Sequence, residues 1–306
     1  MPGNSPIRYV PHDEIDKSKW DKCIDEATNS LIYGYSFYLD HMAKHWDALV
    51  LDDYDAVMPL TWNKKFGIFY LYQPAFTPEL GVFGKDLTED VIKNFIDSIP
   101  AKYKLIEISL NHQNNVVSTP SFISRTNYLL SLNKNYEELL KGYRENHQRN
   151  IQKAVQAGCV SKKNIDVHEI ISLNKRQMSK TGAITDHDYK KFKELYLFLL
   201  NRQEATTYGI VNSKNNLLAS AVFFFSHART YYIMVGNHPD SRTAGASHAL
   251  INTFIKDHAG EDILLDFEGS DIESLARFYS GFGATKETYA AIRWNRLPWW
   301  VKWAKR

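Results

Sequence analysis

The sequence predicts an α/β protein of two lobes, each a mixed, largely antiparallel and twisted sheet flanked by helices. Short apolar runs bounded by turn residues indicate strands, and apolar residues spaced three and four apart indicate amphipathic helices. Both halves of the 306-residue chain also show the same order of elements, a run of antiparallel strands followed by a helix and further strands. We therefore expect an N-terminal lobe over 1–125 and a C-terminal lobe over 126–306.

The first half begins with two short helices and continues with strands joined by hairpins. An acidic turn at 52–55 and a turn at 64–67 separate the first three strands. Thr88 suits a helix N-cap, and Pro100 ends the apolar pattern that follows it. The expected helices are 17–29, 35–44 and 88–99, and the expected strands up to residue 132 are 48–51, 56–62, 68–72, 105–110 and 127–132.

The second half continues with a long helix that ends at Gly158, a residue that suits a helix C-terminus. Three successive strands follow a second helix, and the polar turn 212–216 joins the first two of them. The expected helices are 136–157, 188–201, 242–258 and 272–282, and the expected strands are 205–211, 217–225, 230–235, 263–267 and 285–294.

The composition excludes several classes of protein. The chain has 37 Lys and Arg against 35 Asp and Glu, a formal charge of +2, whereas a protein that grips duplex DNA usually carries a clear basic excess. Cys23 and Cys159 have no partners at metal-ligand spacing, and His41 and His45 lack the Glu of a zinc helix. These two observations lead us to expect neither DNA nor a metal as a ligand. We also expect a cytoplasmic protein, since no apolar signal region or membrane span is visible.

The first candidate site is the passage from the strand 230–235 into the helix at 242. Small residues at the start of this helix leave backbone N–H groups open to an anion such as a pyrophosphate. They suit close packing of the helix on the sheet equally well. The residues concerned are Ile233, Met234 and Val235 in the strand, and Arg242, Thr243, Ala244, Gly245, Ala246 and Ser247 in the helix.

The second candidate site is the end of the strand 263–267. Alternation places Asp266 and Glu268 on one face, at the strand end where open α/β sheets bind ligands. A carboxylate there can accept a proton from an amine nucleophile. Alternatively, Asp266 is a structural hydrogen-bonding group and Glu268 caps the next helix.

Two further groups belong to helices. Tyr279 lies near Phe282 on the inner face of its helix, where it is either an acid or an aromatic core residue. In the helix 136–157, Arg144 and His147 fall on the face formed by Leu140, Tyr143, Ile151, Ala154 and Val155. They are placed to bind an anionic substrate or a donor phosphate, and a buried salt bridge explains them about as well.

These segments together resemble the GNAT superfamily of N-acyltransferases. Arg242-x-x-Gly245-x-Ser247 between a strand and a helix is similar to the pyrophosphate signature Arg/Gln-x-x-Gly-x-Gly/Ala, and Ser247 departs from its last position. Residues 276–283 read Ala-x-Phe-Tyr-x-x-Phe-Gly, which is similar to the helix motif of that family. Residues 143–158 and 266–270 resemble the Fem-type branch, whose members carry tandem GNAT lobes. The resemblance covers residues 125–294, and the first half rests on its order of elements.

The resemblance implies an N-acyltransferase that moves an acyl group from acyl-CoA to an amine of a small-molecule or cell-envelope acceptor. The donor's pantetheine would follow residues 233–235, and its pyrophosphate would rest on the amides of 243–247. Catalysis would consist mainly of positioning, with Glu268 as the base, Asp266 as the second choice, and Tyr279 as the acid for the leaving thiolate.

Two other functions stay open. The Fem branch proper uses aminoacyl-tRNA, and there we would expect Lys where this chain has Tyr279, so the sequence favours a CoA donor over tRNA. The third possibility is a non-catalytic protein that binds an acyl-CoA or an envelope precursor. The tail 297–306, rich in Trp and basic residues, either packs on the other lobe or rests at a lipid interface as a peripheral membrane contact.

Overall fold

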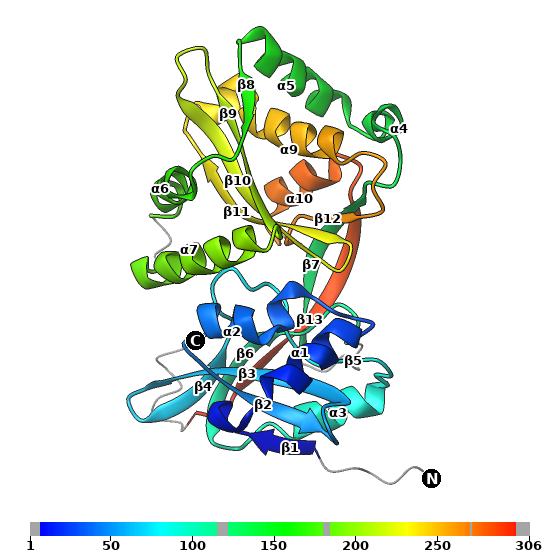
Figure 1. Ribbon diagram of the computed structural model, residues 1–306, viewed down its shortest axis with the longest axis vertical. Helices are drawn as coiled ribbons and strands as arrows, with labels where there is room; N and C mark the ends of the chain where they lie inside the picture. The colour runs from blue at the N-terminus through cyan, green and yellow to red at the C-terminus, as the bar shows by residue number, and fades with distance from the viewer. Residues whose placement is uncertain (1–6, 115–121, 180–183, 270, 298–306) are drawn as a thin grey trace. The chain divides into compact units, whose positions relative to one another are not determined.

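Helices and mixed sheets make up both halves of the chain (Figure 1), as the α/β prediction requires. The computed structural model describes residues 7–114, 122–179, 184–269 and 271–297. One compact unit holds the described residues up to Arg125 together with those from Thr288 onward, and the other is Thr126–Glu287. The C-terminal strand thus crosses from the second unit into the first, whereas the sequence placed all of it in the second.

The first unit contains a sheet whose strands run in the order β1, β2, β3, β4, β6 and the C-terminal half of β13. Only β4 and β6 are parallel in this set, and β5 adds a short antiparallel pair to β3. The strands are β1 (Ile7–Val10), β2 (His45–Leu51), β3 (Ala56–Lys65), β4 (Ile68–Tyr72), β5 (Phe83–Gly84), β6 (Tyr103–Ser109) and β13 (Thr285–Asn295).

Two helices of the first unit start where the sequence supplies a cap. Asp16 accepts hydrogen bonds from the amides of Ser18 and Lys19, and Thr88 accepts one from Val91. Both of these helices bury an apolar face, and Trp20 is fully buried in the one that Asp16 caps. The helices are η1 (His12–Glu14), α1 (Lys17–Glu26), η2 (Ile32–Gly34), α2 (Ser36–Met42) and α3 (Glu89–Asp97).

The second unit contains a sheet in the order β7, β12, β11, β10, β9 and β8. The pair β11 and β12 is parallel, and the other neighbours in this set are antiparallel. The strands are β7 (Phe122–Ser131), which enters from the first unit, β8 (Val160–Lys163), β9 (Ala205–Val211), β10 (Leu217–Ser226), β11 (Arg229–Asn237) and β12 (Leu264–Asp266).

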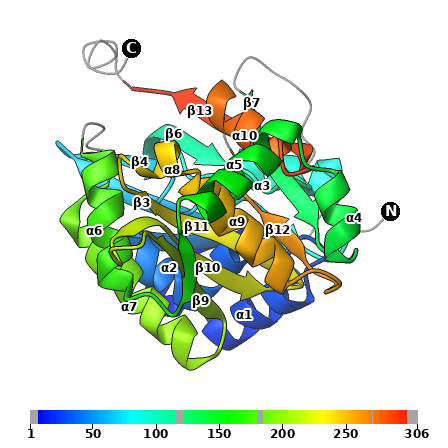
Figure 2. The ribbon, with the colours of Figure 1, turned by 90° about the horizontal axis from the view of Figure 1, so that it is seen from above.

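Helices cover both faces of this second sheet (Figures 1 and 2). Phe223 and Phe224 are neighbours on β10 and therefore point to opposite faces. The ring of Phe223 stacks on Phe254 of α9 at 3.9 Å between centroids, and Phe224 stacks on Phe192 of α7 at 5.5 Å. The helices are α4 (Tyr136–Lys141), α5 (Glu145–Gln156), α6 (Val167–Met178), α7 (Asp186–Asn201), α8 (Ser241–Ala244), α9 (Ala246–Asp257) and α10 (Glu273–Ser280).

Two helices that the sequence predicted as continuous are broken. The segment 136–157 forms α4 and α5, because Arg144 is extended and its amide donates to the carbonyl of Gly281 at 2.9 Å. The segment 242–258 forms α8 and α9, because Gly245 takes a left-handed conformation with φ +72°. Val155, predicted on the buried face, is 71% exposed.

The sequence analysis also missed elements. The strands β1, β5 and β8 are short, and α6 was left without an assignment although Asp166 caps it and Ile170 and Leu173 are buried. No helix in the part of the chain that the structure describes is long and apolar enough to span a bilayer. The prediction that the tail 297–306 packs on the other lobe or rests at a lipid interface concerns residues after Leu297, which lie outside the described residues.

We predict that Phe254→Ala lowers the free energy of unfolding by about 3–5 kcal/mol, because it removes a fully buried ring from the core of the second unit. Phe198→Ala, at a ring that is 36% exposed, should cost less than about 1 kcal/mol. Denaturant unfolding of both variants measures the difference, and equal losses would contradict the packing described here.

Candidate functional site

β11 and β12 run side by side for three residue pairs and then part. Their last pair is Tyr231 with Asp266, where β12 ends, while β11 continues to Asn237. On its other edge β11 stays paired with β10 as far as Asn237. Within the described residues, no strand pairs with the β12 side of β11 beyond Tyr231, so this stretch of backbone has no strand partner on that side.

A β-bulge marks the start of this open stretch. Val222 of β10 pairs with Met234 and the next residue, Phe223, pairs with Tyr232, so Ile233 is an extra residue in β11. A bulge bends its strand and re-aims the side chains and backbone groups beside it, and bulges are frequent next to active sites. The bend therefore coincides with the point where β11 leaves β12.

Polar side chains of α6 hold the far end of the open stretch. The side-chain amide of Asn174 donates to the carbonyl of Val235 at 2.7 Å, and Tyr189 donates to Asn174 at 2.6 Å. Gln177 accepts from the amide of Asn237 at 3.0 Å. The sequence analysis missed these residues, although the cap at Asp166 and the apolar spacing after it would have indicated the helix.

The residues predicted to bind the donor differ in exposure. Ile233, Met234, Gly245 and Ala246 are buried, Val235, Ala244 and Ser247 are half-buried, and Arg242 and Thr243 are exposed. The amides of Ala244 and Gly245 already donate to carbonyls of Asp240 and Arg242. The first-turn amides of α9 at 246–248 are therefore the ones that an anion can reach.

Gly245 also has a packing role. A Cβ atom placed on it would lie 2.2 Å from the carbonyl oxygen of Asn150 in α5, so only glycine fits between the two helices. Close by, the hydroxyl of Ser247 lies 2.8 Å from that of Ser241 and donates to the side chain of Asn237, also at 2.8 Å. The end of β11 and the start of α9 are thus fixed to each other.

Asp266 forms a buried ion pair. Its Oδ2 accepts from the guanidinium of Arg229 at 3.0 Å, and its Oδ1 accepts from the amide of Glu268 at 2.8 Å. The two side chains of the pair are 9% and 3% exposed. Because both carboxylate oxygens are engaged, the geometry corresponds to the structural role that the sequence analysis gave as the alternative for Asp266.

Glu268 and Tyr279 come together at the end of β12. Burial of the Tyr279 hydroxyl raises its pKa, and the nearby carboxylate of Glu268 raises it further. The ring of Tyr279 stacks on Phe267 at 4.7 Å between centroids and lies 6.5 Å from Tyr232 of β11. The structure therefore brings the predicted base and acid to the place where β11 and β12 part.

Arg144 and His147 tie α5 to the end of α10. The guanidinium of Arg144 donates to the hydroxyl of Ser280 at 3.1 Å, and Nε2 of His147 donates to the carbonyl of Phe278 at 2.8 Å. The imidazole ring packs on Gly281, where a Cβ atom would lie 2.0 Å from it. Among the described residues neither side chain pairs with a carboxylate, so the predicted salt bridge is absent there.

A second histidine completes this contact. The rings of His147 and His248 meet edge to face at 4.7 Å between centroids. Burial lowers the pKa of both rings, that of His248 to about 4. The neighbouring His147 lowers the pKa of His248 further, and the guanidinium of Arg144 lowers that of His147. Nδ1 of His147 is buried without a hydrogen-bond partner, which fits a neutral ring.

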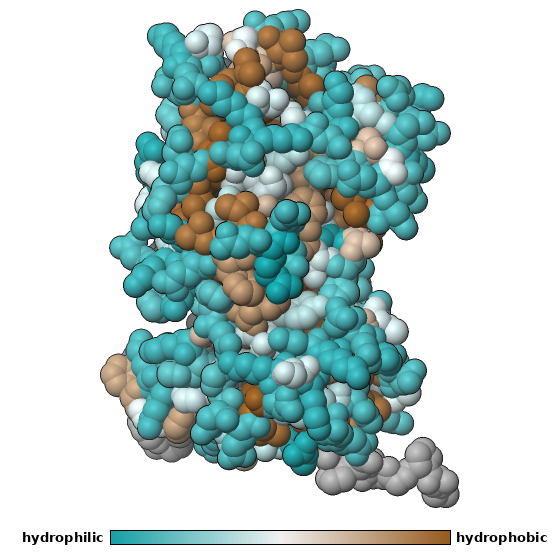
Figure 3. Space-filling view, viewed as in Figure 1, coloured by the Kyte–Doolittle hydropathy of each residue, from teal (hydrophilic) through white to brown (hydrophobic). Residues whose placement is uncertain are grey.

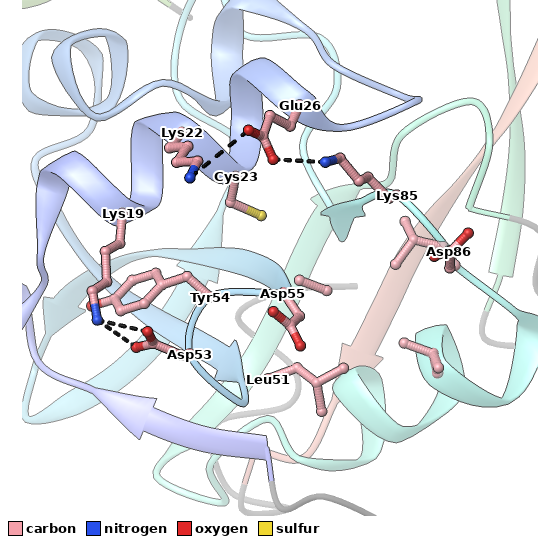
Figure 4. Close-up of a pocket in the computed structure, with 13 residues that line it drawn as sticks. Lys19, Lys22, Cys23, Glu26, Leu51, Asp53, Tyr54, Asp55, Lys85 and Asp86 are labelled. Carbon is pink, nitrogen blue, oxygen red and sulfur yellow. Dashed lines mark hydrogen bonds and ion pairs between the residues drawn. The ribbon is translucent and has the colours of Figure 1, made fainter. Parts of the chain in front are cut away.

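Two surface cavities among the described residues belong to the first unit. One, of about 570 Å³, lies between α1 and the turn that joins β2 to β3 (Figure 4). Its charged lining is largely neutralised, since Lys19 pairs with Asp53 and Lys85 pairs with Glu26. The other, of about 480 Å³, lies beside β4, β6 and β13. None of the predicted site residues lines either cavity.

No protein-family model and no curated protein sequence matches the chain. Solved structures do: FemX has a TM-score of 0.64 at 13% identity, over 93% of this chain and 97% of that one. A conserved protein of unknown function from Bacteroides thetaiotaomicron has a TM-score of 0.58 at 13% identity, over 93% and 99%. The C-terminal DUF2156 domain of an Agrobacterium fabrum protein has a TM-score of 0.54 at 7% identity, over 92% of each. The chain thus shares the overall fold of FemX, as the resemblance of its sequence to the Fem-type branch led us to expect.

We predict that Arg229→Met destabilises the protein by about 3–5 kcal/mol, because it leaves the carboxylate of Asp266 buried without its partner. The double variant Arg229→Met with Asp266→Leu should recover much of this loss, since both charges are then gone. As a control, Arg277→Met at the exposed pair with Glu273 should cost less than about 1 kcal/mol. Denaturant unfolding measures all three, and a double variant as unstable as the single one would refute the pairing.

We also predict that stability falls as the pH drops from about 6.5, the ordinary pKa of histidine, toward 4. In that window the unfolded chain binds protons at His147 and His248 that the folded chain does not, so acid favours unfolding. His248→Gln should flatten the decline, whereas His187→Gln, at an exposed position in α7, should not. Unfolding midpoints across the pH range measure this, and parallel curves for wild type and His248→Gln would contradict it.

Proposed function

We propose that the chain is an N-acyltransferase that moves an acyl group from acyl-CoA to an amine, with its donor site in the second unit. The observation that carries the proposal is the open edge of β11 beyond Tyr231, which starts at the bulge of Ile233. The amide groups of an extended pantetheine arm can pair with such an edge as an added strand does. The residues at 233–235 would therefore line the arm.

The start of α9 supplies the second part of the donor site. First-turn amides at 246–248 and the positive end of the helix dipole favour a pyrophosphate. The exposed Arg242 and Thr243 precede these amides and add a positive charge and a hydroxyl group. Gly245 contributes by packing, since it lets α5 approach the start of α9.

Acyl-CoA would supply the acyl thioester, and the chain would supply proton transfer at the end of β12. Glu268 takes the proton from the acceptor ammonium group, so that the amine can form its new bond to the acyl carbon. Tyr279, whose raised pKa keeps the phenol protonated at neutral pH, gives its proton to the sulfur as the thioester bond breaks, and the phenolate takes up the second proton from the newly bonded nitrogen. Asp266 holds the backbone of Glu268 and is a positioning residue.

The acceptor is an amine of a small molecule or of a cell-envelope precursor. In this proposal Arg144 and His147 act on the site indirectly, by holding α5 against the end of α10 that carries Tyr279. A CoA donor is favoured over aminoacyl-tRNA because a neutral Tyr279 stands where a Lys would be expected, and because the formal charge of the chain is only +2.

The test is an assay of acyl transfer from acetyl-CoA and longer acyl-CoAs to a panel of amines. The rate is measured from the free thiol that the reaction releases. We predict that Glu268→Gln and Tyr279→Phe each lower kcat by about 10²–10⁴, the range expected for loss of proton transfer. Glu273→Gln and Tyr136→Phe are matched controls away from the end of β12 and should keep wild-type rates.

Binding separates the three functions considered. An acyl-CoA that binds the folded chain raises its melting temperature, and so would aminoacyl-tRNA if that were the donor. Stabilisation by tRNA alone, or stabilisation by acyl-CoA without product for any amine, would overturn the proposal in favour of the corresponding alternative. Unchanged rates in both Glu268→Gln and Tyr279→Phe would overturn the assignment of the two residues.

A further inference from the structure

One end of the first sheet combines exposed positive charge with an exposed aromatic ring. The hairpin between β3 and β4 turns at Phe66 and Gly67, and Phe66 is 91% exposed (Figure 3 shows this side of the first unit). The start of β6 and the end of β13 lie at the same end. We call the exposed residues gathered there the basic-aromatic end: Lys64, Lys65, Phe66, Lys102, Lys104 and Arg296.

The strand register places these residues together. Lys64 pairs with Phe69 of β4, and Phe69 pairs with Tyr103 at the start of β6. β13 runs antiparallel to β6, and the amide of Arg296 just after it donates to the carbonyl of Lys104 at 2.7 Å. The ends of four neighbouring strands therefore present one continuous surface.

The charge of this surface is positive. Lys102 has a carboxylate nearby, that of the buried Asp47 at 3.8 Å. Among the residues that the structure describes, the other four cations of the basic-aromatic end have no carboxylate at ion-pair distance. Lys64 and Arg296 lie over the rings of Phe69 and Trp294, at 4.7 and 4.6 Å from the ring centroids. The chain as a whole is nearly neutral, so this is a local concentration of charge.

Folding does not account for Phe66. Phe66 and Gly67 have φ values of +50° and +79°, the left-handed conformations of a two-residue type I′ hairpin turn. Asn or Asp is preferred at the first of these positions, and a bulky aromatic residue there is strained. The turn thus keeps an unfavourable residue whose ring is left in solvent, which points to a contact outside the chain.

We propose that the basic-aromatic end docks the protein on an anionic lipid membrane. Cations beside anionic headgroups attract the surface, and an aromatic ring at a hairpin tip can enter the interfacial region. In the sequence, Leu297 is followed by Trp299, Trp300 and Trp303 with Lys302, Lys305 and Arg306, a composition typical of membrane interfaces. The inference does not rest on the proposed enzyme activity.

Nucleic acid is the other polyanion that such charges attract, and the position of Phe66 favours the membrane. Proteins that stack bases carry their rings along a groove that follows the phosphate backbone. Here the ring stands at the tip of a hairpin, with Lys64 and Lys65 behind it along β3. This order of groups suits insertion between headgroups.

The full chain is to be floated with vesicles of phosphatidylcholine alone and with vesicles that contain phosphatidylglycerol as half of their lipid. We predict binding only to the second, and weaker binding as salt screens the charges. Lys64→Gln with Lys65→Gln should weaken it roughly thirtyfold, and Phe66→Asn about tenfold. Phe66→Asn should leave the melting temperature unchanged or raise it, because Asn suits the turn.

Two matched controls come from the second unit. The double variant Lys141→Gln with Lys153→Gln removes two exposed cations, and Val155→Gln replaces an exposed apolar residue. Both should bind vesicles as the wild type does. Equal binding to both kinds of vesicle, or losses in the controls as large as in the test variants, would overturn the proposal. So would binding of transfer RNA that Phe66→Asn weakens while vesicles stay unbound, an outcome that would assign the surface to nucleic acid.

Discussion

The buried ion pair between Arg229 and Asp266 is the contact on which the candidate site depends. It joins the first residue of β11 to the last residue of β12 across their short parallel contact, and the same carboxylate accepts a hydrogen bond from the amide of Glu268. A buried charge pair of this kind adds little to stability when compared with apolar residues, although it is costly to break. Its role is therefore one of geometry: it fixes where β12 ends, and with that the place where the two strands part.

The rest of the second unit keeps that opening in place from two sides. On one face, Asn174 of α6 donates to the carbonyl of Val235 in β11, and Gln177 accepts from the amide of Asn237. On the other face, α5 is locked to α10 through His147, whose ring occupies the space that a side chain at Gly281 would fill. α10 in turn carries Tyr279. Burial of His147 and His248 keeps both rings uncharged, so the contact between α5 and α10 is most stable at neutral pH.

The sequence predicted what depends on local pattern and missed what depends on tertiary contact. The strand over 205–211 has the predicted bounds, because a short run rich in β-branched residues before a polar turn indicates a strand without tertiary information. The break between α4 and α5 could not be predicted, since it is stabilised by Gly281, more than a hundred residues away in sequence. The sequence motifs identified Asp266, Glu268 and Tyr279 as candidates for the site. They did not show that Arg229 pairs with Asp266, because that contact forms only in the folded chain.

Glu268 shows how backbone conformation and chemistry meet at this strand end. Both Glu268 and Gly269 have left-handed φ values, +62° and +77°, and a Cβ atom on Gly269 would lie 2.5 Å from the carbonyl oxygen of Thr126. A Glu residue is disfavoured in that backbone conformation unless surrounding contacts impose it. Here the imposing contacts are the bond from its amide to Asp266 and the close approach of Gly269 to β7. The chain thus retains local strain next to a carboxylate that lies near enough to Tyr279 to raise its pKa, and this is the arrangement that the proposed proton transfer requires.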